Sequence, residues 1–278
     1  MLGCTALWRR GSAGEHKRYK RVASINDLAT LHQLKMLSLT NNGDIIKEGT
    51  LKSMILMDTM QIALTNMESL PLDISNMLKL RRIVLECPHL VKLESNFCNF
   101  HNMSNLELTD CSMLEELPHL HKLKSLKQLR IIRCTHLKKF PEEFGEIGAF
   151  SLLEIFSIVG LDNLVELPKV EEGAMVSLQM FIVMECGALR TLPSSYLHLK
   201  TLQKLRIYGC PMAAESLKGS LKGVELANKT VDVMIMSVED SEEVKRRYFQ
   251  VKGQMTGWLY GEFWCNELFL FLKSLEAF

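Results

Sequence analysis

Cysteine is the residue type whose number and spacing in this sequence most invite a chemical role. The chain holds eight cysteines, and thiolates at suitable spacing bind zinc or form disulfides. No C-x-x-C pair and no paired Cys and His spacing of the zinc-binding kind occurs. Five of them recur singly, each shortly after an apolar segment: Cys87, Cys111, Cys134, Cys186 and Cys210. We therefore predict buried, reduced thiols, which imply a reducing compartment.

Other motifs that could support catalysis are incomplete or missing from the sequence. The stretch Gly223-x-x-x-x-Asn228-Lys229-Thr230 resembles a phosphate-binding loop but lacks its second glycine, and we expect a strand after it where a helix is required. The eight histidines are scattered, and no G-x-S-x-G, H-E-x-x-H or EF-hand spacing occurs. We therefore predict that the protein is not an enzyme and binds no metal and no cofactor.

The five cysteines belong to a sequence repeat, which is clearest from Leu126 to Pro141. This stretch follows the template L-x-x-L-x-L-x-x-C-x-x-L-x-x-L-P, with Ile131 and Phe140 in two of the leucine positions. The anchor position of the template, held by Cys or Leu, recurs at residues 111, 134, 161, 186 and 210, which are 23, 27, 25 and 24 residues apart. This spacing is the period of a leucine-rich repeat.

The template predicts how each repeat folds. Its L-x-x-L-x-L half contains a short segment of period two, so Leu129 and Ile131 point to one face of a strand while Arg130 points to the other. No single repeat can bury its own leucines, so the repeats must stack. We predict an α/β fold: a leucine-rich repeat solenoid with a curved parallel sheet on its concave face, loops and short helical turns on its convex face, and a C-terminal strand-helix-helix cap.

We expect three regions along the chain. Residues 1–22 form a basic segment without regular structure, and residues 23–212 form the repeat domain. This domain holds about seven or eight repeats, of which residues 50–79 are degenerate. Residues 213–278 form the capping segment, with a strand at Val231 to Ile235 and two helices after residue 240.

Departures from the template predict local changes within the repeat domain. Cys87 comes one residue early, which indicates an irregular turn near Glu86. The insert 142–151 lengthens one convex loop and should contain a helical turn. In the degenerate part, the candidate strand residues are Leu51, Met54 and Leu56.

Composition narrows the classes of partner. Lys and Arg number 33 against 32 Asp and Glu, a formal charge of +1. This balance gives no overall signal for nucleic acid or an anionic membrane. The sequence has no apolar run long enough for a membrane span. We expect a cytoplasmic protein, or one shared between nucleus and cytoplasm, that binds other proteins.

The concave face is the usual binding surface of this architecture, and the template predicts which residues lie on it. We expect a partner-binding strip on this face that is centred on Arg130, Ile182 and Arg206, with these side chains facing solvent. A solvated face of mixed charge is the alternative, although apolar residues such as Ile182 favour binding. The candidate partner-binding residues are Arg81, Glu107, Lys127, Arg130, Ile132, Arg133, Met180, Ile182, Lys204, Arg206 and Tyr208.

The cysteine-anchored repeats resemble a known family. The stretches LRRIVLECPHLVKL, LELTDCSMLEELP, LKQLRIIRCTHLKKFP and LQMFIVMECGALRTLP are similar to the repeat region of plant nucleotide-binding leucine-rich repeat disease-resistance proteins. The resemblance covers about residues 28–212, and no motif of the family's nucleotide-binding module occurs in this sequence. It implies a role in defence, with a pathogen effector, a host guardee or an intramolecular nucleotide-binding module as the protein partner.

Two other readings of the repeats stay open. The chain could be a leucine-rich repeat adaptor in signalling or in substrate selection by a ubiquitin ligase, which an upstream F-box-like helical segment would favour. It could also be a non-catalytic fragment of a repeat-containing kinase, which a signal peptide and a membrane span would favour. The F-box-like segment, the signal peptide and the membrane span are all absent from this sequence.

Overall fold

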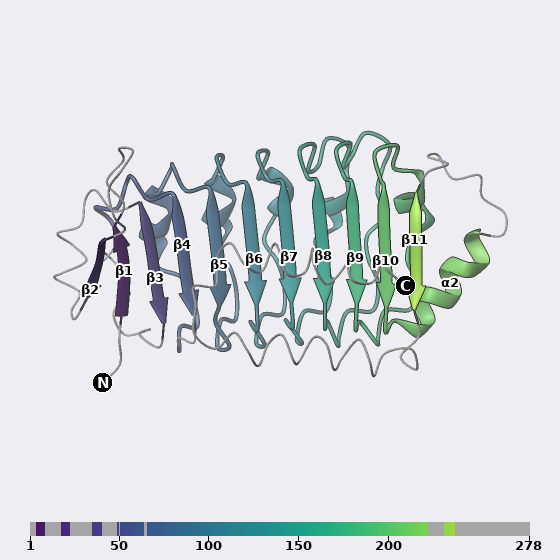
Figure 1. Cartoon of the computed structure of the whole chain (residues 1–278), viewed down its shortest axis with the longest axis horizontal. Helices are drawn as coiled ribbons and strands as arrows, with labels where there is room; N and C mark the ends of the chain where they lie inside the picture. Colours follow the sequence, from purple (N-terminus) through teal and green to yellow (C-terminus); the bar gives the residue numbers. More distant parts are fainter. Residues whose placement is uncertain are drawn as a thin grey trace. The chain divides into compact units, whose positions relative to one another are not determined.

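The computed structural model describes residues 4–8, 18–22, 35–40, 49, 51–63, 66–221 and 231–236. Their strands form a single eleven-stranded sheet in the order β11-β10-β9-β8-β7-β6-β5-β4-β3-β1-β2 (Figure 1). The strands are β1 Cys4–Trp8, β2 Arg18–Val22, β3 Met36–Thr40, β4 Thr59–Ala63, β5 Arg82–Glu86, β6 Asn105–Thr109, β7 Gln128–Ile132, β8 Ile155–Val159, β9 Met180–Met184, β10 Lys204–Tyr208 and β11 Asp232–Met236. The described helices are η2 Leu72–Asn76, η3 Ser95–Asn99, η4 Leu120–Lys122, η5 Glu142–Gly145, η6 Ser194–His198 and α2 Pro211–Leu221.

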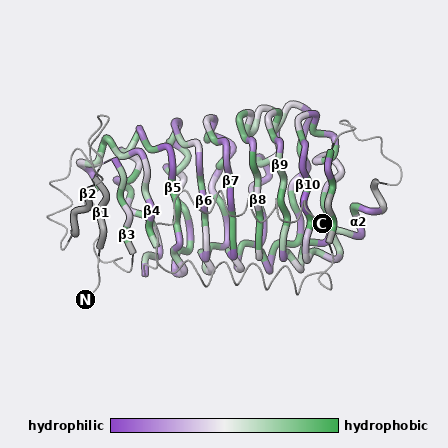
Figure 2. The backbone as a smooth tube through the Cα atoms, viewed as in Figure 1, coloured by the Kyte–Doolittle hydropathy of each residue, from purple (hydrophilic) through white to green (hydrophobic). Residues whose placement is uncertain are grey.

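Strands β3 to β10 are parallel and pair in the register that the template predicts. Leu106 of β6 lies beside Leu129 of β7, and Leu108 lies beside Ile131. The second and fourth residues of every strand from β3 to β10 are buried, and Figure 2 shows apolar residues recurring from strand to strand. A slip of one residue would turn both rows away from the core. The predicted leucine-rich repeat architecture is therefore confirmed.

Strand β4 lies outside the segment where we expected it. The sequence pointed to Leu51, Met54 and Leu56, but the strand is Thr59–Ala63. Within it, Met60 and Ile62 continue the two buried rows. Methionine is flexible enough to fill a leucine site in a core, and this substitution hid the repeat.

The turn after each regular strand contains one residue with left-handed backbone. The φ angles are 52° at Asp110, 52° at Arg133, 64° at Gly160, 52° at Glu185 and 61° at Gly209. Four of these residues donate their N–H to the last strand residue of the next repeat, for example Asp110 N to the Ile132 oxygen at 2.9 Å.

After β5 the chain has no room for this left-handed residue. Cys87 follows the last strand residue, Glu86, directly. It is nevertheless fully buried, as the later anchors are. The irregular turn expected near Glu86 is thus a deletion of the left-handed position.

The convex side consists of short 3-10 helices and loops over an aromatic core. The helical turn expected in the insert 142–151 is present as η5. Phe156 and Phe181 stack with ring centroids 5.0 Å apart, and Tyr196 of η6 stacks on Phe181 at 4.8 Å. These rings fill the space between repeats where leucine alone would leave gaps.

Strands outside the regular repeats flank the sheet at both ends. β1 and β2, within a segment for which the sequence predicts no regular structure, pair antiparallel, and β1 pairs with β3. At the other end, α2 follows β10 and β11 adjoins β10, where the sequence predicts a strand. Extra strands at an edge protect the repeats from unwanted pairing. The two helices predicted after residue 240 lie outside the described residues.

Candidate functional site

The face of the sheet opposite the core is formed by the first, third and fifth residues of β3 to β10, and we call it the concave face. Its middle row runs Ser38, Gln61, Val84, Glu107, Arg130, Ser157, Ile182 and Arg206. Four members of this row, Glu107, Arg130, Ile182 and Arg206, are among the candidate residues that the sequence predicts, whereas Gln61 lies on the strand β4 that the sequence misplaces. Parallel pairing sets neighbouring members about one strand spacing, ~4.8 Å, apart.

Much of the expected binding strip is buried, and this corrects the prediction that it faces solvent. Ile182 is 0% exposed, Arg206 4% and Arg130 6%. Ile132 and Tyr208, in the row formed by the fifth strand residues, are buried as well. Sequence periodicity determines the face on which a side chain lies, but it does not determine how much of that face remains open.

Arg206 has a structural partner at the end of the sheet. Its Nη2 lies 2.5 Å from Asp232 Oδ2, and its Nη1 donates to the backbone oxygen of Asp232 at 2.9 Å. Charge-assisted bonds of this kind are stronger than neutral ones. Arg206 therefore ties β11 to β10, a role that the sequence did not indicate.

The basic stretch around Arg130 is compensated by acidic residues of neighbouring repeats. Arg130 Nη1 lies 3.9 Å from Glu107 Oε2, with both side chains largely buried. Lys127 Nζ lies 3.1 Å from Glu154 Oε1. Two basic side chains of the predicted strip thus already have acidic neighbours within the chain.

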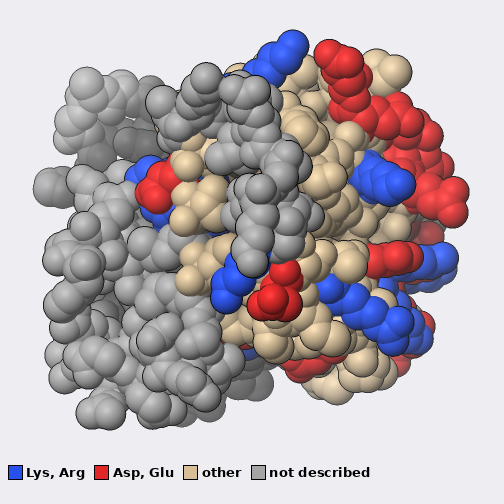
Figure 3. Space-filling view, turned by 90° about the vertical axis from the view of Figure 1, so that its right-hand side faces the viewer, with Lys and Arg blue, Asp and Glu red and all other residues tan. Residues whose placement is uncertain are grey.

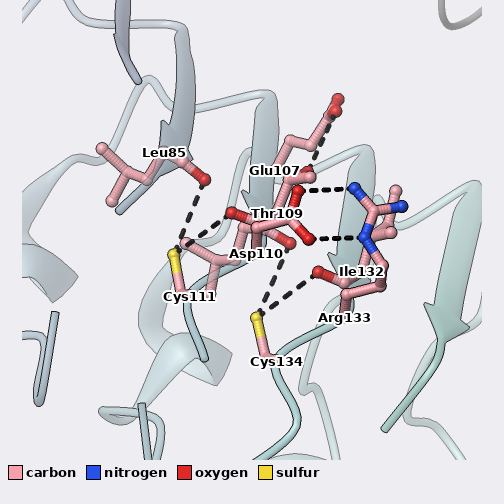
Figure 4. A network of polar contacts seen from close by, with 9 residues as sticks. Leu85, Glu107, Thr109, Asp110, Cys111, Ile132, Arg133 and Cys134 are labelled. Atoms are coloured by element: carbon pink, nitrogen blue, oxygen red, sulfur yellow. Dashed lines mark hydrogen bonds and ion pairs between the residues drawn. The ribbon is translucent and has the colours of Figure 1, made fainter. Parts of the chain in front are cut away.

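Arg133 lies in the turn after β7 and not on the strand face. Its guanidinium pairs in a bidentate manner with Asp110, the equivalent turn residue of the preceding repeat, with Nη2 2.5 Å from Oδ2. Figure 4 shows this pair beside the thiols of Cys111 and Cys134. The next turn position is Gly160, where an added Cβ would lie 3.2 Å from the Arg133 Cγ.

The predicted burial of the anchor cysteines is confirmed. The six cysteines whose side chains the structure describes are free and buried. The Cys134 Sγ lies 3.8 Å from the Leu108 oxygen of the preceding repeat. A hydrogen bond with Cys134 and burial together raise the pKa of the Cys111 thiol well above its ordinary value. A thiol that stays protonated is a poor nucleophile and metal ligand.

The first row of the concave face remains partly accessible. Ile155 and Met180 are register neighbours in β8 and β9, and Lys204 follows in β10. All three are half-buried. Arg81 lies just before β5, is exposed, and pairs with Asp58. Of the predicted site, the structure thus leaves mainly this row and its edge open to a partner.

A shallow pocket lies beyond the strand ends, where the sequence predicted none. Its volume is about 410 Å³, and its lining includes Pro88, Asp110, Ser112, Arg133, Thr135, Gly160, Asp162 and Glu185. Among the residues that the structure describes, no group of three or more His, Cys, Asp or Glu side chains could hold a metal ion. No helix in this part of the chain is long and apolar enough to cross a membrane.

Comparisons with known proteins agree with this geometry. No family model and no curated protein matches the sequence. Among solved structures, the leucine-rich repeat domain of the type III effector XopL matches with a TM-score of 0.61 and 20% identity, over 74% of this chain and 69% of that one. The fold is a leucine-rich repeat solenoid.

Weaker similarities point to other bacterial proteins of this repeat class. A leucine-rich repeat protein of Leptospira interrogans matches with a TM-score of 0.39 and 16% identity, over 78% of this chain and 71% of that chain. An internalin of Listeria monocytogenes matches with a TM-score of 0.22 and 12% identity, over 77% and 89%. The similarity to the XopL domain, at 20% identity, concerns the leucine-rich repeat fold and not its partners.

Proposed function

We propose that this leucine-rich repeat domain is a protein-binding module that uses the first row of its concave face. The observation that carries the proposal is the arrangement of the first row itself. Ile155 and Met180 lie side by side in register, half-buried, with Gln128 on one side and Lys204 on the other. An apolar centre with a polar rim is the usual anatomy of a protein interface.

The buried middle row lies beside this surface, on the same face of the sheet. Ile182 and Arg206 are too deeply buried to meet a partner directly. Arg206 is instead bonded to Asp232 of β11, and it lies on the strand that carries Lys204. Preorganised side chains lose little entropy on binding, which favours affinity. The partner-binding role therefore moves from the middle row, as the sequence suggested, to the row beside it.

We further propose a role in plant intracellular immunity, in which the domain recognises a pathogen effector or a host guardee, or docks a nucleotide-binding module. The support is the resemblance of the cysteine-anchored repeats to plant disease-resistance proteins. The buried free thiols are compatible with the reducing cytoplasm that this role requires.

A capture experiment with paired variants tests the binding surface. We expect Ile155→Lys with Met180→Lys to remove specific partners from a plant-cell extract, because charge placed in the apolar centre stays unpaired on binding. The matched control is Leu72→Lys, an exposed apolar residue of η2 on the convex side. Equal partner sets for all three folded proteins would place the binding surface elsewhere.

A further inference from the structure

The convex loops leading into β8 and β9 form a feature that the regular repeats lack. The two loops, residues 142–151 and 169–177, belong to the repeats whose anchors lie 27 and 25 residues after the preceding ones, against 23 and 24 for the other two spacings. In Figure 1 the two loops lie above the starts of β8 and β9. We call residues 142–151 and 169–177 the acidic loop pair.

Backbone hydrogen bonds join the two loops into one unit. Gly148 N donates to the Gly173 oxygen at 3.2 Å, and Met175 N donates to the Ala149 oxygen at 2.9 Å. Phe150 and Met175 occupy equivalent places and both adopt left-handed backbone, with φ of 50° and 48°. Non-glycine residues hold this conformation only where the surroundings enforce it.

The loops also approach too closely to tolerate a larger residue. Glu171 N donates to the Gly145 oxygen at 2.8 Å. A Cβ at Gly145 would lie 1.8 Å from the Lys169 oxygen. The loop pair is thus a preformed surface, since its backbone is fixed by contacts within the chain.

This preformed surface exposes apolar side chains to water. Ile147 is 74% exposed, although its backbone N–H is held by Glu171 Oε2 at 3.1 Å. Leu152 and Val176 are each about half exposed. Their segments lie together, since the Ser177 Oγ donates to the Ser151 oxygen at 2.7 Å. Clustered exposed apolar residues with polar neighbours mark interaction sites more often than single ones do.

Acidic residues outnumber basic ones around these apolar residues, although the Lys124 Nζ reaches the Gly148 oxygen at 3.4 Å. The loop pair contains five glutamates and a single lysine, Lys169, which gives a formal charge of −4 within a chain of net charge +1. The Glu172 side chain is almost fully exposed, with Lys200 Nζ 4.0 Å away. Figure 3 shows Asp and Glu side chains gathered along the upper right edge of the described surface.

We propose that the acidic loop pair docks a basic amphipathic segment of a partner protein. Apolar side chains of that segment would pack on Ile147, Leu152 and Val176, and its Lys or Arg residues would meet the surrounding glutamates. The negative sign of the surface disfavours nucleic acid and anionic lipid, and charge complementarity favours a basic peptide. This site is separate from the concave row and does not depend on its function.

Binding of a defined probe to the full chain tests the proposal. The probe is a synthetic amphipathic helical peptide of leucine and lysine, with a leucine and glutamate version as the charge control. Ile147→Ser should weaken binding of the basic peptide about tenfold, the size expected for truncating an interface anchor. Leu78→Ser, at a similarly exposed leucine (61%) outside the acidic loop pair, should leave it unchanged.

The salt dependence of peptide binding distinguishes recognition by charge from non-specific hydrophobic binding. Glu146→Gln with Glu172→Gln should flatten the dependence of affinity on ionic strength, because fewer charges are screened. Any of four results would overturn the proposal: no binding of the basic peptide, equal binding of the acidic peptide, equal loss with Leu78→Ser, or only self-association through Ile147.

Discussion

Arg206 of β10 and Asp232 of β11 form an ion pair that closes the C-terminal end of the parallel strands. The Arg206 side chain is nearly inaccessible, whereas that of Asp232 is 55% exposed. The two partners are therefore unequal, and so are the consequences of removing them. Loss of Asp232 leaves a buried cation without this partner, while loss of Arg206 leaves an exposed carboxylate.

We predict that Asp232→Ala destabilises the protein more than Arg206→Met does. Breaking a fully buried pair costs about 3–5 kcal/mol. Asp232→Ala should cost less than this, because Arg206 keeps its bond to the backbone oxygen of residue 232, whereas the solvated carboxylate left by Arg206→Met costs little. Urea denaturation of both variants measures the free energies of unfolding. Equal losses, or a larger loss for Arg206→Met, would show that the pair does not hold β11.

The stacked core predicts a large cost for a single truncation. Leu129 is fully buried between Leu106 and Phe156 in the first core row. Leu129→Ala should lower the free energy of unfolding by about 2–5 kcal/mol through loss of packing and a residual cavity. Lys124→Ala, at an exposed convex position, is the control. An unchanged denaturation midpoint for Leu129→Ala would contradict the register.

The left-handed turn predicts a specific requirement for glycine. At Gly160 the φ is 64° and an added Cβ would lie 3.2 Å from the Arg133 Cγ. Gly160→Ala should therefore cost about 1 kcal/mol or more. At Gly187 an added Cβ meets nothing within 4 Å, so Gly187→Ala should be close to neutral. Thermal melting that ranks the two variants the other way would refute the steric account.

Burial of the anchors predicts slow reaction with thiol reagents. Cys134 and its equivalents lie against backbone oxygens within the core. Iodoacetamide should label them fully only after denaturation, since the native protein does not expose their sulfur atoms. Mass spectrometry of intact protein counts the labels. Rapid native labelling at several anchors would mean that the repeats open readily.

The Cys111 thiol predicts a loss of stability in alkali. The hydrogen bond with Cys134 and burial raise the pKa of Cys111 well above its ordinary value of 9.0. Above pH ~9 the unfolded thiol loses its proton and the folded thiol keeps it, so the free energy of unfolding falls, by at most about 1.4 kcal/mol per pH unit for one thiol. We expect Cys111→Ala to show a shallower fall in the free energy of unfolding from about pH 8 to about pH 10, the range around the ordinary pKa of a thiol. An identical slope in the variant would exclude this thiol as the cause.

How far the sequence predicts this structure depends on the kind of feature. The rows of Leu106 and Leu129 follow from period two and repeat stacking, so the register is predictable from spacing. The position of β4 was not predictable in this way, because Met60 occupies a leucine position. The pairing of Asp110 with Arg133 could have been anticipated, since the two residues are one repeat of 23 apart and hold the same template position.

Burial of the concave face could not be predicted in the same way. Ile182 and Arg206 alternate with core residues as any outward-facing residues would. For Arg206, low accessibility goes with the contact to Asp232, which lies 26 residues further along the chain and outside the template. Periodicity is local, whereas accessible surface is a property of the assembled fold.

Site-specific photo-crosslinking tests most directly the claim that the first row of the concave face binds a protein. A photoreactive amino acid at Met180, and another at Leu72 as the convex control, would be introduced into separate copies of the full chain and exposed in plant-cell extract. We predict protein adducts of defined mass at position 180 that Ile155→Lys abolishes, and no such adducts at position 72. Adducts confined to position 72, or adducts at position 180 that persist with Ile155→Lys, would contradict the claim.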